Sequence, residues 1–226
     1  MLPRPLICLV TDRRRLAQRL EVGPDEPQID ERLANLVAGA ADAGIDLVQA
    51  RENDLPALGM IRLVRRFLDI VRGTKTRIVV NDRLDVALAA GAHGVHLKDG
   101  PVAIERVRAA APGGFLIGQS IHSPERAADA SADYLVFGTV FSTPSKPEAH
   151  DLAGLAGLRA AVRQARVPVL AIGGVKLTHL AGVAGTGAAG IAAVDLFLPD
   201  GPQLVVPLHR ISEEVRQAFD SVGPAP

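Results

Sequence analysis

Several polar side chains follow short apolar segments of the sequence, where they could bind an anionic ligand. Arg51 and Lys146 offer fixed positive charge, and guanidinium and ammonium groups form strong hydrogen bonds to phosphate oxygens. Other residues that follow apolar segments carry hydroxyl or amide groups. Two of them are adjacent glycines, whose backbone N–H groups a ligand can approach closely. These further residues are Gln49, Asn81, Ser120, Thr143, Ser145, Gly173 and Gly174. The set suits a phosphorylated small molecule.

His122 is the candidate for proton transfer. A histidine imidazole gives and takes protons near neutral pH with little tuning, so it can serve as a general acid or base. In isolation, its place before Ser123 and Pro124 is more typical of an ordinary loop residue at a helix start. His93 and His96 are three residues apart, so in a strand they point to opposite faces and are not expected to bind one metal ion.

The Asn81-Asp82 pair and Cys8 could each have a purely structural role. Asn81 and Asp82 either cap a helix starting near Arg83 or contribute to a metal site, and the residues alone favour neither. Cys8 lies inside the first apolar segment and is expected to be a small core residue.

The chemistry-bearing residues must be positioned by a repeated alternation of strands and helices. The expected strands are Leu6–Val10, Ile45–Gln49, Thr76–Asn81, Gly94–Leu97, Phe115–Ser120, Tyr134–Gly138, Pro168–Ile172 and Ala189–Val194. The expected helices are Ile29–Ala43, Leu55–Arg72, Pro101–Ala111, Pro124–Ala130, Leu155–Gln164, Leu177–Ala184 and Val205–Phe219.

This alternation predicts an α/β fold, a TIM (β/α)8 barrel that forms one domain over residues 1–226. Strands that are apolar on both faces and separated by helices pair in parallel through right-handed crossovers, and eight such units suit closure. The competing arrangement is a doubly wound open sheet, but no G-x-G-x-x-G follows the first strand.

In such a barrel, the polar residues that follow the strands converge on one mouth. Phosphate sites there commonly use the loops after the seventh and eighth strands, which in this chain hold Gly173, Gly174, Ala192 and Ala193. A paired glycine can also serve only a tight strand-to-helix turn. Its position after the seventh strand favours phosphate binding.

Composition excludes several other classes of protein. Lysine plus arginine and aspartate plus glutamate each number 25, so there is no net positive charge for nucleic acid or an anionic membrane, and neither is an expected partner. The single cysteine cannot form an internal disulfide and no secretion signal stands at the start, which predicts a cytoplasmic protein. Outer helix faces rich in alanine and leucine make a homodimer an open expectation.

Taken together, the motifs resemble the thiamine-phosphate synthase/TenI family. The resemblance runs from the first strand to the eighth. Its motifs are Leu9-Val10-Thr11-Asp12-Arg13, Gln49-x-Arg51-Glu52, Asn81-Asp82-Arg83-x-Asp85-x-Ala87, Gly94-Val95-His96-Leu97, Gly118-x-Ser120-x-His122, Asp133-Tyr134, Phe141-x-Thr143-x-Ser145-Lys146 and Ala171-Ile172-Gly173-Gly174.

The resemblance implies a barrel enzyme of thiamine biosynthesis that handles a thiazole phosphate, and two activities divide the family. The synthase joins a pyrimidine methyl diphosphate to the thiazole phosphate, with Mg²⁺ holding the departing pyrophosphate. TenI-type members move a proton within a carboxylated thiazole phosphate, which makes the ring aromatic, and the resemblance implies no cofactor for that reaction.

Two departures from the synthase pattern favour the tautomerase. Synthases typically carry a lysine where this chain has Asn53, and a carboxylate where it has Pro101. Asp82 then remains as a metal ligand only if the chain is a synthase, with Asp99 as a substitute for the second carboxylate. The resemblance also implies a catalytic role for His122 beside Arg51 and Lys146.

The sequence therefore predicts a TenI-like thiazole tautomerase that needs no cofactor. The alternative is a thiamine-phosphate synthase that uses Mg²⁺. A third hypothesis is a regulatory protein that binds a thiazole or thiamine phosphate without catalysis, although such a protein would need only the phosphate anchor.

Overall fold

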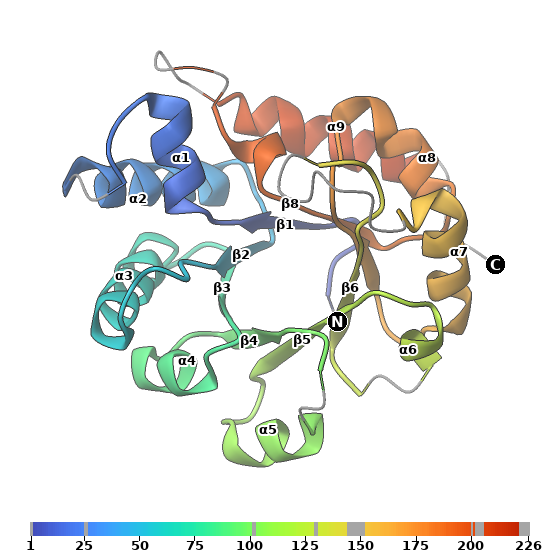
Figure 1. The fold of residues 1–226 in the computed structure, drawn as a ribbon, viewed down its shortest axis with the longest axis horizontal. Helices are drawn as coiled ribbons and strands as arrows, with labels where there is room; N and C mark the ends of the chain where they lie inside the picture. Colours follow the sequence, from blue (N-terminus) through green and yellow to red (C-terminus); the bar gives the residue numbers. More distant parts are fainter. Residues whose placement is uncertain are drawn as a thin grey trace.

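Parallel strands close into a barrel in the order of the sequence, with helices on the outside (Figure 1), which confirms the predicted TIM barrel. The structure is a computed structural model that describes residues 2–24, 27–100, 103–128, 131–143, 152–199, 201 and 206–221. The last strand pairs with the first, and the register places Leu6 beside Gly190 and Leu9 beside Ala193.

The strands begin and end within two residues of the predicted bounds, because each is a short run of apolar and β-branched residues. They are β1 (Leu6–Val10), β2 (Leu47–Ala50), β3 (Arg77–Asn81), β4 (Gly94–Leu97), β5 (Leu116–Ile121), β6 (Tyr134–Phe137), β7 (Val169–Ala171) and β8 (Gly190–Ala193).

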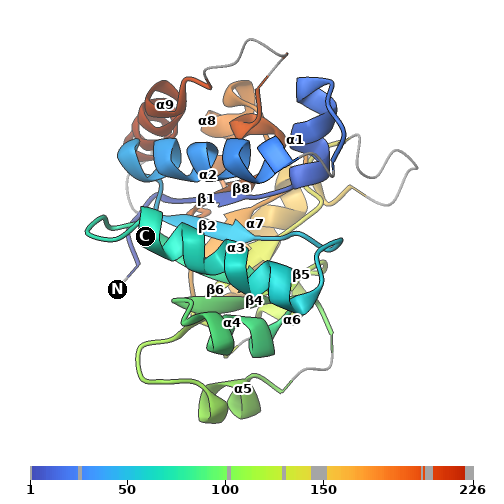
Figure 2. The same cartoon turned by 90° about the vertical axis from the view of Figure 1, so that its left-hand side faces the viewer.

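Helices follow the strands, and α2, α3 and α4 lie next to one another along one side (Figure 2). The sequence did not predict α1, since it is only eight residues long, begins with three arginines, and has a short apolar face of Leu16, Ala17 and Leu20. The helices are α1 (Arg13–Leu20), α2 (Pro27–Asp42), α3 (Ala57–Ile70), α4 (Leu84–Ala90), α5 (Ile104–Ala110), α6 (Glu125–Ala128), α7 (Gly154–Gln164), α8 (Leu180–Ala184) and α9 (Leu208–Asp220), with 3₁₀ turns η1 (Leu177–His179) and η2 (Asp195–Phe197).

The strands bury their side chains in two separate cores, as a closed parallel barrel requires. In β1, Leu6, Cys8 and Val10 belong to the cluster inside the barrel, whereas Ile7 and Leu9 pack between the sheet and the helices. Cys8 is fully buried, which confirms it as a core residue, and burial raises the pKa of its thiol to about 12.

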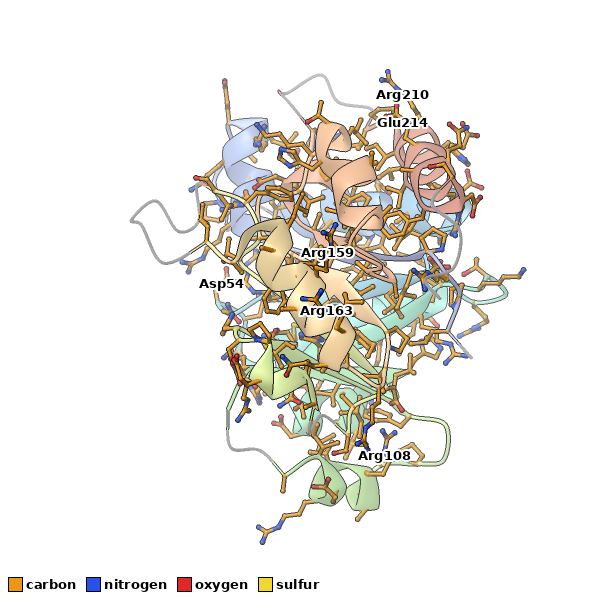
Figure 3. The ribbon with its side chains drawn as sticks, turned by 90° about the vertical axis from the view of Figure 1, so that its right-hand side faces the viewer. Asp54, Arg108, Arg159, Arg163, Arg210 and Glu214 are labelled. Atoms are coloured by element: carbon orange, nitrogen blue, oxygen red, sulfur yellow. The ribbon has the colours of Figure 1, made fainter. Side chains whose placement is uncertain are left out.

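Charged pairs secure the loops at both ends of the barrel. At the amino ends of the strands, Arg108 of α5 contacts both carboxylate oxygens of Asp133, which precedes β6. Asp54 follows β2 and lies toward the opposite side of the molecule (Figure 3).

No helix in the described part of the chain is long and apolar enough to cross a membrane.

Candidate active site

A cavity of about 370 Å³ opens at the carboxyl ends of the strands, where the loops after them converge. It brings together most of the residues that the sequence predicts for the site. Those lining it are Gln49, Arg51, Asn81, Ser120, His122, Thr143, Gly173, Gly174 and Ala193.

The remaining predicted residues lie elsewhere or outside the described ranges. Ala192 is fully buried in the core inside the barrel and does not line this cavity. Asp82 and Asp99 are not lining residues either. Asp82 pairs with the lining residue Lys98, and the Asp99 carboxylate binds the Arg126 guanidinium of α6 at 3.0 Å. Ser145 and Lys146 fall outside the residues that the structure describes.

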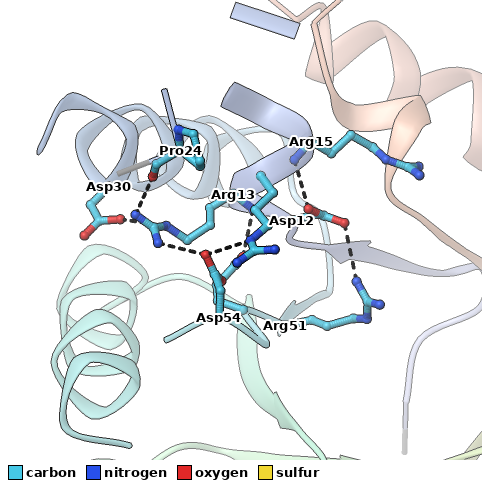
Figure 4. Close-up of polar contacts among 9 residues, drawn as sticks. Asp12, Arg13, Arg15, Pro24, Asp30, Arg51 and Asp54 are labelled. Atoms are coloured by element: carbon cyan, nitrogen blue, oxygen red, sulfur yellow. Dashed lines mark hydrogen bonds and ion pairs between the residues drawn. The ribbon is translucent and has the colours of Figure 1, made fainter. Parts of the chain in front are cut away.

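Arg51 is held at the mouth by the loop that follows β1. Its backbone N–H donates to Oγ1 of Thr11 at 3.0 Å, and its Nη1 lies 3.4 Å from Oδ2 of Asp12. The other oxygen of Asp12 accepts a hydrogen bond from the Arg15 backbone N–H at 3.0 Å, which caps α1. One carboxylate thus joins Arg51 to the start of α1 (Figure 4).

A second group of polar side chains comes from β2, β3 and β4. The amide of Gln49 donates to Oδ1 of Asn81 at 2.8 Å, and Lys98 Nζ lies 2.7 Å from Oδ2 of Asp82. The capping interpretation of Asn81 and Asp82 is wrong, since α4 has Arg83 at its N-cap and no side chain caps it. Both residues instead bond to neighbours at the barrel mouth.

Asp82 is the acidic residue that could help to hold a divalent cation. No group of three or more histidine, cysteine or acidic residues within the described ranges could hold a metal ion by itself. Mg²⁺ in phosphate sites needs only one or two protein carboxylates, because the substrate phosphates supply further oxygens. Asp82 meets this minimum, since its partner is the ammonium of an exposed lysine that a metal ion can displace.

His96 forms a neutral polar contact at the base of the cavity. Its Nε2 lies 2.9 Å from Oγ of Ser120, and its Nδ1 lies 3.2 Å from the Tyr134 hydroxyl. Burial lowers the pKa of His96 to about 4, so the ring is neutral at pH 7. One ring nitrogen therefore donates and the other accepts, which fixes the orientation of Ser120.

His122 lies at the end of β5 and presents one ring nitrogen to the protein. Its Nδ1 contacts the carbonyl oxygen of Gly138 at 2.5 Å. Because a carbonyl oxygen only accepts hydrogen bonds, Nδ1 carries a proton in this contact, and Nε2 is the ring nitrogen that is left for a ligand. His122 lines the cavity, so the structure brings it to the same site as Arg51.

Gly173 and Gly174 have backbone conformations that favour glycine, with φ of 97° and 61°. A Cβ atom on Gly174 would lie 2.2 Å from the carbonyl oxygen of Ser142, and one on Gly173 would lie 2.5 Å from Cγ2 of Thr139. The two glycines therefore let the loops after β6 and β7 pack closely at the cavity wall.

Glu52 is a buried acid beside the site. Its Oε2 accepts a hydrogen bond from the Arg13 backbone N–H at 2.7 Å, whereas Oε1 is buried with no hydrogen-bond partner among the described residues. Burial raises the pKa of Glu52 to about 7, although the bond from Arg13 opposes this. Glu52 thus joins the loop after β2 to the first turn of α1.

Sequence reasoning did not assign five polar or charged residues of the cavity lining to the site. They are Asp12, Arg15, His96, Lys98 and Asp195. The rule that the carboxyl ends of strands meet at one mouth places His96 and Lys98 there from the sequence, but no role was assigned to them. The same rule applies to Asp12, which stands two residues after the end of β1. Arg15 lies in a helix that was not predicted, which concealed its position.

Comparison with known proteins gives one consistent family. A model described as thiamine monophosphate synthase matches residues 10–197. The thiamine-phosphate synthase of Roseiflexus sp. (strain RS-1) is 34% identical over 211 residues, which are 91% of this chain and 84% of that protein. The thiamine-phosphate synthase of Methanoregula boonei is 36% identical over 188 residues, 82% of this chain and 87% of that protein.

A solved structure agrees with these relatives. The thiamine phosphate pyrophosphorylase from Pyrococcus furiosus superposes with a TM-score of 0.74 at 30% sequence identity, covering 97% of this chain and 98% of that one. The names of these relatives favour the synthase activity over the tautomerase activity that the sequence predicts.

Proposed function

Because the chain belongs to the thiamine monophosphate synthase family, we propose that it is a thiamine-phosphate synthase, a transferase that joins a pyrimidine methyl diphosphate to a thiazole phosphate. The observation that carries this proposal is one cavity lined by Arg15, Arg51 and Lys98. Arg51 and Lys98 follow β2 and β4, whereas Gly173 and Gly174 follow β7 and Arg15 pairs with Asp195 after β8.

Several cations and a glycine loop around one cavity suit a reaction between two phosphorylated molecules. The wall with Arg51 and Lys98 is the place for the diphosphate, since a departing pyrophosphate gains negative charge that nearby cations stabilise. The glycine loop after β7 is the place for the single phosphate of the thiazole, as the sequence predicts. The thiazole nitrogen then bonds to the methylene carbon as the carbon–oxygen bond to the diphosphate breaks.

The chain's own residues position both partners in this reaction. Asp12 orients the Arg51 guanidinium, and the hydrogen bond between Gln49 and Asn81 fixes two amides beside it. Asp82 is the described residue that would hold a Mg²⁺ ion carried in with the diphosphate, and such an ion would neutralise charge on the leaving group. Holding the two reactants in one orientation lowers the entropy cost of their encounter.

The second candidate is the thiazole tautomerase, and His122 favours it. Its Nε2 is an acceptor at the cavity, so it could remove and return a proton of a carboxythiazole phosphate. Asn53 also stands where the resemblance expects a lysine of the synthase.

One paired assay separates the two activities. The purified chain is incubated with pyrimidine methyl diphosphate, thiazole phosphate and Mg²⁺, and in parallel with the carboxythiazole phosphate tautomer, with and without EDTA. We expect thiamine phosphate and pyrophosphate from the first mixture and loss of both under EDTA. Aromatisation of the tautomer that survives EDTA, with no coupled product in the first mixture, would establish the tautomerase instead.

A further inference from the structure

An ion pair closes the wall of the cavity beside the proposed phosphate site. Nη1 of Arg15 lies 2.7 Å from Oδ2 of Asp195, which directly follows Val194 after β8. Both side chains are partly buried, with exposed fractions of 19% and 35%. Arg15 and Asp195 line the same cavity as Gly173, Gly174 and Ala193, so their charges act on any anion bound there.

The backbone of Arg15 is fixed by contacts on the opposite side of α1. Arg13 donates from Nη2 to the carbonyl oxygen of Pro24 at 2.7 Å, and its Nη1 lies 3.0 Å from Oδ2 of Asp54. Asp12 caps the helix through the Arg15 N–H. Figure 4 shows that the side chains of Arg13 and Arg15 leave α1 in opposite directions, so the cluster around Arg13 anchors the helix while Arg15 faces the cavity.

Asp195 by itself would oppose phosphate binding. A carboxylate beside a phosphate raises the free energy of the bound state, because like charges repel strongly in a cavity that excludes part of the water. Two guanidinium groups offset that charge, since Nη2 of Arg19 lies 3.6 Å from Oδ1 of Asp195 in addition to the contact with Arg15.

The guanidinium of Arg15 has more donors than Asp195 uses. It carries five N–H groups, of which Asp195 binds one at Nη1. A phosphate can accept from the others, and Arg19 keeps Asp195 balanced when it does.

We propose that Arg15 is a further substrate-binding residue, whose guanidinium binds the phosphate of the thiazole phosphate, and that Asp195 is a positioning residue that holds Arg15 toward the cavity. This inference rests on the proposed function, because it assigns the phosphate end of the same site. It predicts that the enzyme requires a phosphorylated thiazole and discriminates against the corresponding alcohol through Arg15.

The test compares Arg15→Gln and Asp195→Asn by isothermal titration in EDTA, with inorganic phosphate, thiazole phosphate and thiazole alcohol as the ligands. We expect Arg15→Gln to weaken binding of both phosphates by roughly 10- to 100-fold, the loss typical of a charge-assisted hydrogen bond. Binding of the alcohol should be unchanged. Asp195→Asn should tighten phosphate binding, because it removes a negative charge and keeps an oxygen that accepts from Arg15.

The opposite signs distinguish a binding role from a structural one. If the ion pair only braces the fold, both variants should weaken phosphate and alcohol binding together and lower the melting temperature alike. That result, or unchanged phosphate binding in Arg15→Gln, would overturn the inference. Arg14→Gln is the matched control, since Arg14 points to Asp54 and does not line this cavity.

The titrations do not depend on turnover. A wild-type chain that yields no coupled product fails the proposed function, whereas the phosphate titrations still decide the role of Arg15.

Discussion

Nζ of Lys98 lies 2.7 Å from Oδ2 of Asp82. The lysine ammonium group is therefore paired with the carboxylate that would bind a Mg²⁺ ion carried by the diphosphate. The pair is partly exposed, with 64% of the lysine side chain and 33% of the aspartate side chain accessible, and exposed pairs contribute little to stability. The same lysine supplies positive charge at the cavity wall. Lys98 therefore has two opposing effects on a reaction that uses Mg²⁺.

Replacing Lys98 with glutamine should separate these effects. We expect the Mg²⁺ concentration that gives half-maximal coupling to fall by roughly two- to fivefold, because Asp82 is released from a pair worth less than about 1 kcal/mol. The KM for the diphosphate should rise, since one cation is lost. Rates measured over a Mg²⁺ titration test both, with the exposed Lys75→Gln as control. An unchanged Mg²⁺ requirement would show that Asp82 does not bind the ion.

For the second candidate function, the tautomerase, His122→Ala and His122→Gln should lower kcat for aromatisation of the carboxythiazole phosphate by about 10²- to 10⁴-fold. Neither side chain exchanges a proton near neutral pH, although glutamine can still donate to the Gly138 carbonyl. Phosphate binding should persist, because we place the phosphate at Gly173, Gly174 and Arg15. Stopped-flow absorbance of the ring would follow the reaction, and near wild-type turnover in either variant would assign the proton to another group.

Glu52→Gln should flatten the dependence of stability on pH. The pKa of Glu52 is about 7 in the folded protein and near 4.5 in the unfolded chain, so between these values the folded protein keeps a proton that the unfolded chain releases. The free energy of unfolding therefore falls as pH rises from about 4.5 to 7, and stays lower above that range.

Glutamine has no such penalty and can still accept from the Arg13 N–H. Urea unfolding at pH 5 and pH 8 measures the difference, which should be smaller in Glu52→Gln than in the wild type. The exposed Glu213→Gln should leave the wild-type difference in place. Equal pH dependence in wild type and Glu52→Gln would show that Glu52 ionises normally.

Gly174→Ala should destabilise the protein by more than Gly44→Ala does. Both glycines have positive φ, 61° and 70°, so alanine is strained at either position by roughly 1 kcal/mol. A Cβ atom meets nothing within 4 Å at Gly44, whereas at Gly174 it meets the Ser142 carbonyl at 2.2 Å. Thermal melts of the two variants measure the extra loss of stability that the clash at Gly174 causes. Equal losses of stability would mean that the loops after β6 and β7 can move apart to accept the Cβ atom.

The sequence predicted the barrel because apolar strand segments and helical spacing are local properties. It also predicted most of the cavity residues, since the rule about strand ends needs no distances. It could not predict that Lys98 pairs with Asp82 or Asp99 with Arg126, because adjacent residues in a loop turn in directions that only the fold decides. Helix α1 was missed because its apolar face is short, with Leu16 and Ala17 in the core, and contacts of Arg13 with Glu52 and Asp54 add to its stability.

The pairing of β1 with β8 determines when the ion pair between Arg15 and Asp195 can form during synthesis. Arg15 and Asp195 are 180 residues apart in sequence, and they meet only after Gly190–Ala193 has joined Leu6–Val10. While β8 is still inside the ribosome, the nascent chain therefore lacks Asp195 at this end of the cavity. A ligand that contacts both Arg15 and the loop after β8 binds only the closed barrel. Such a ligand therefore stabilises the pairing of β1 with β8, the last strand pairing that the growing chain can make.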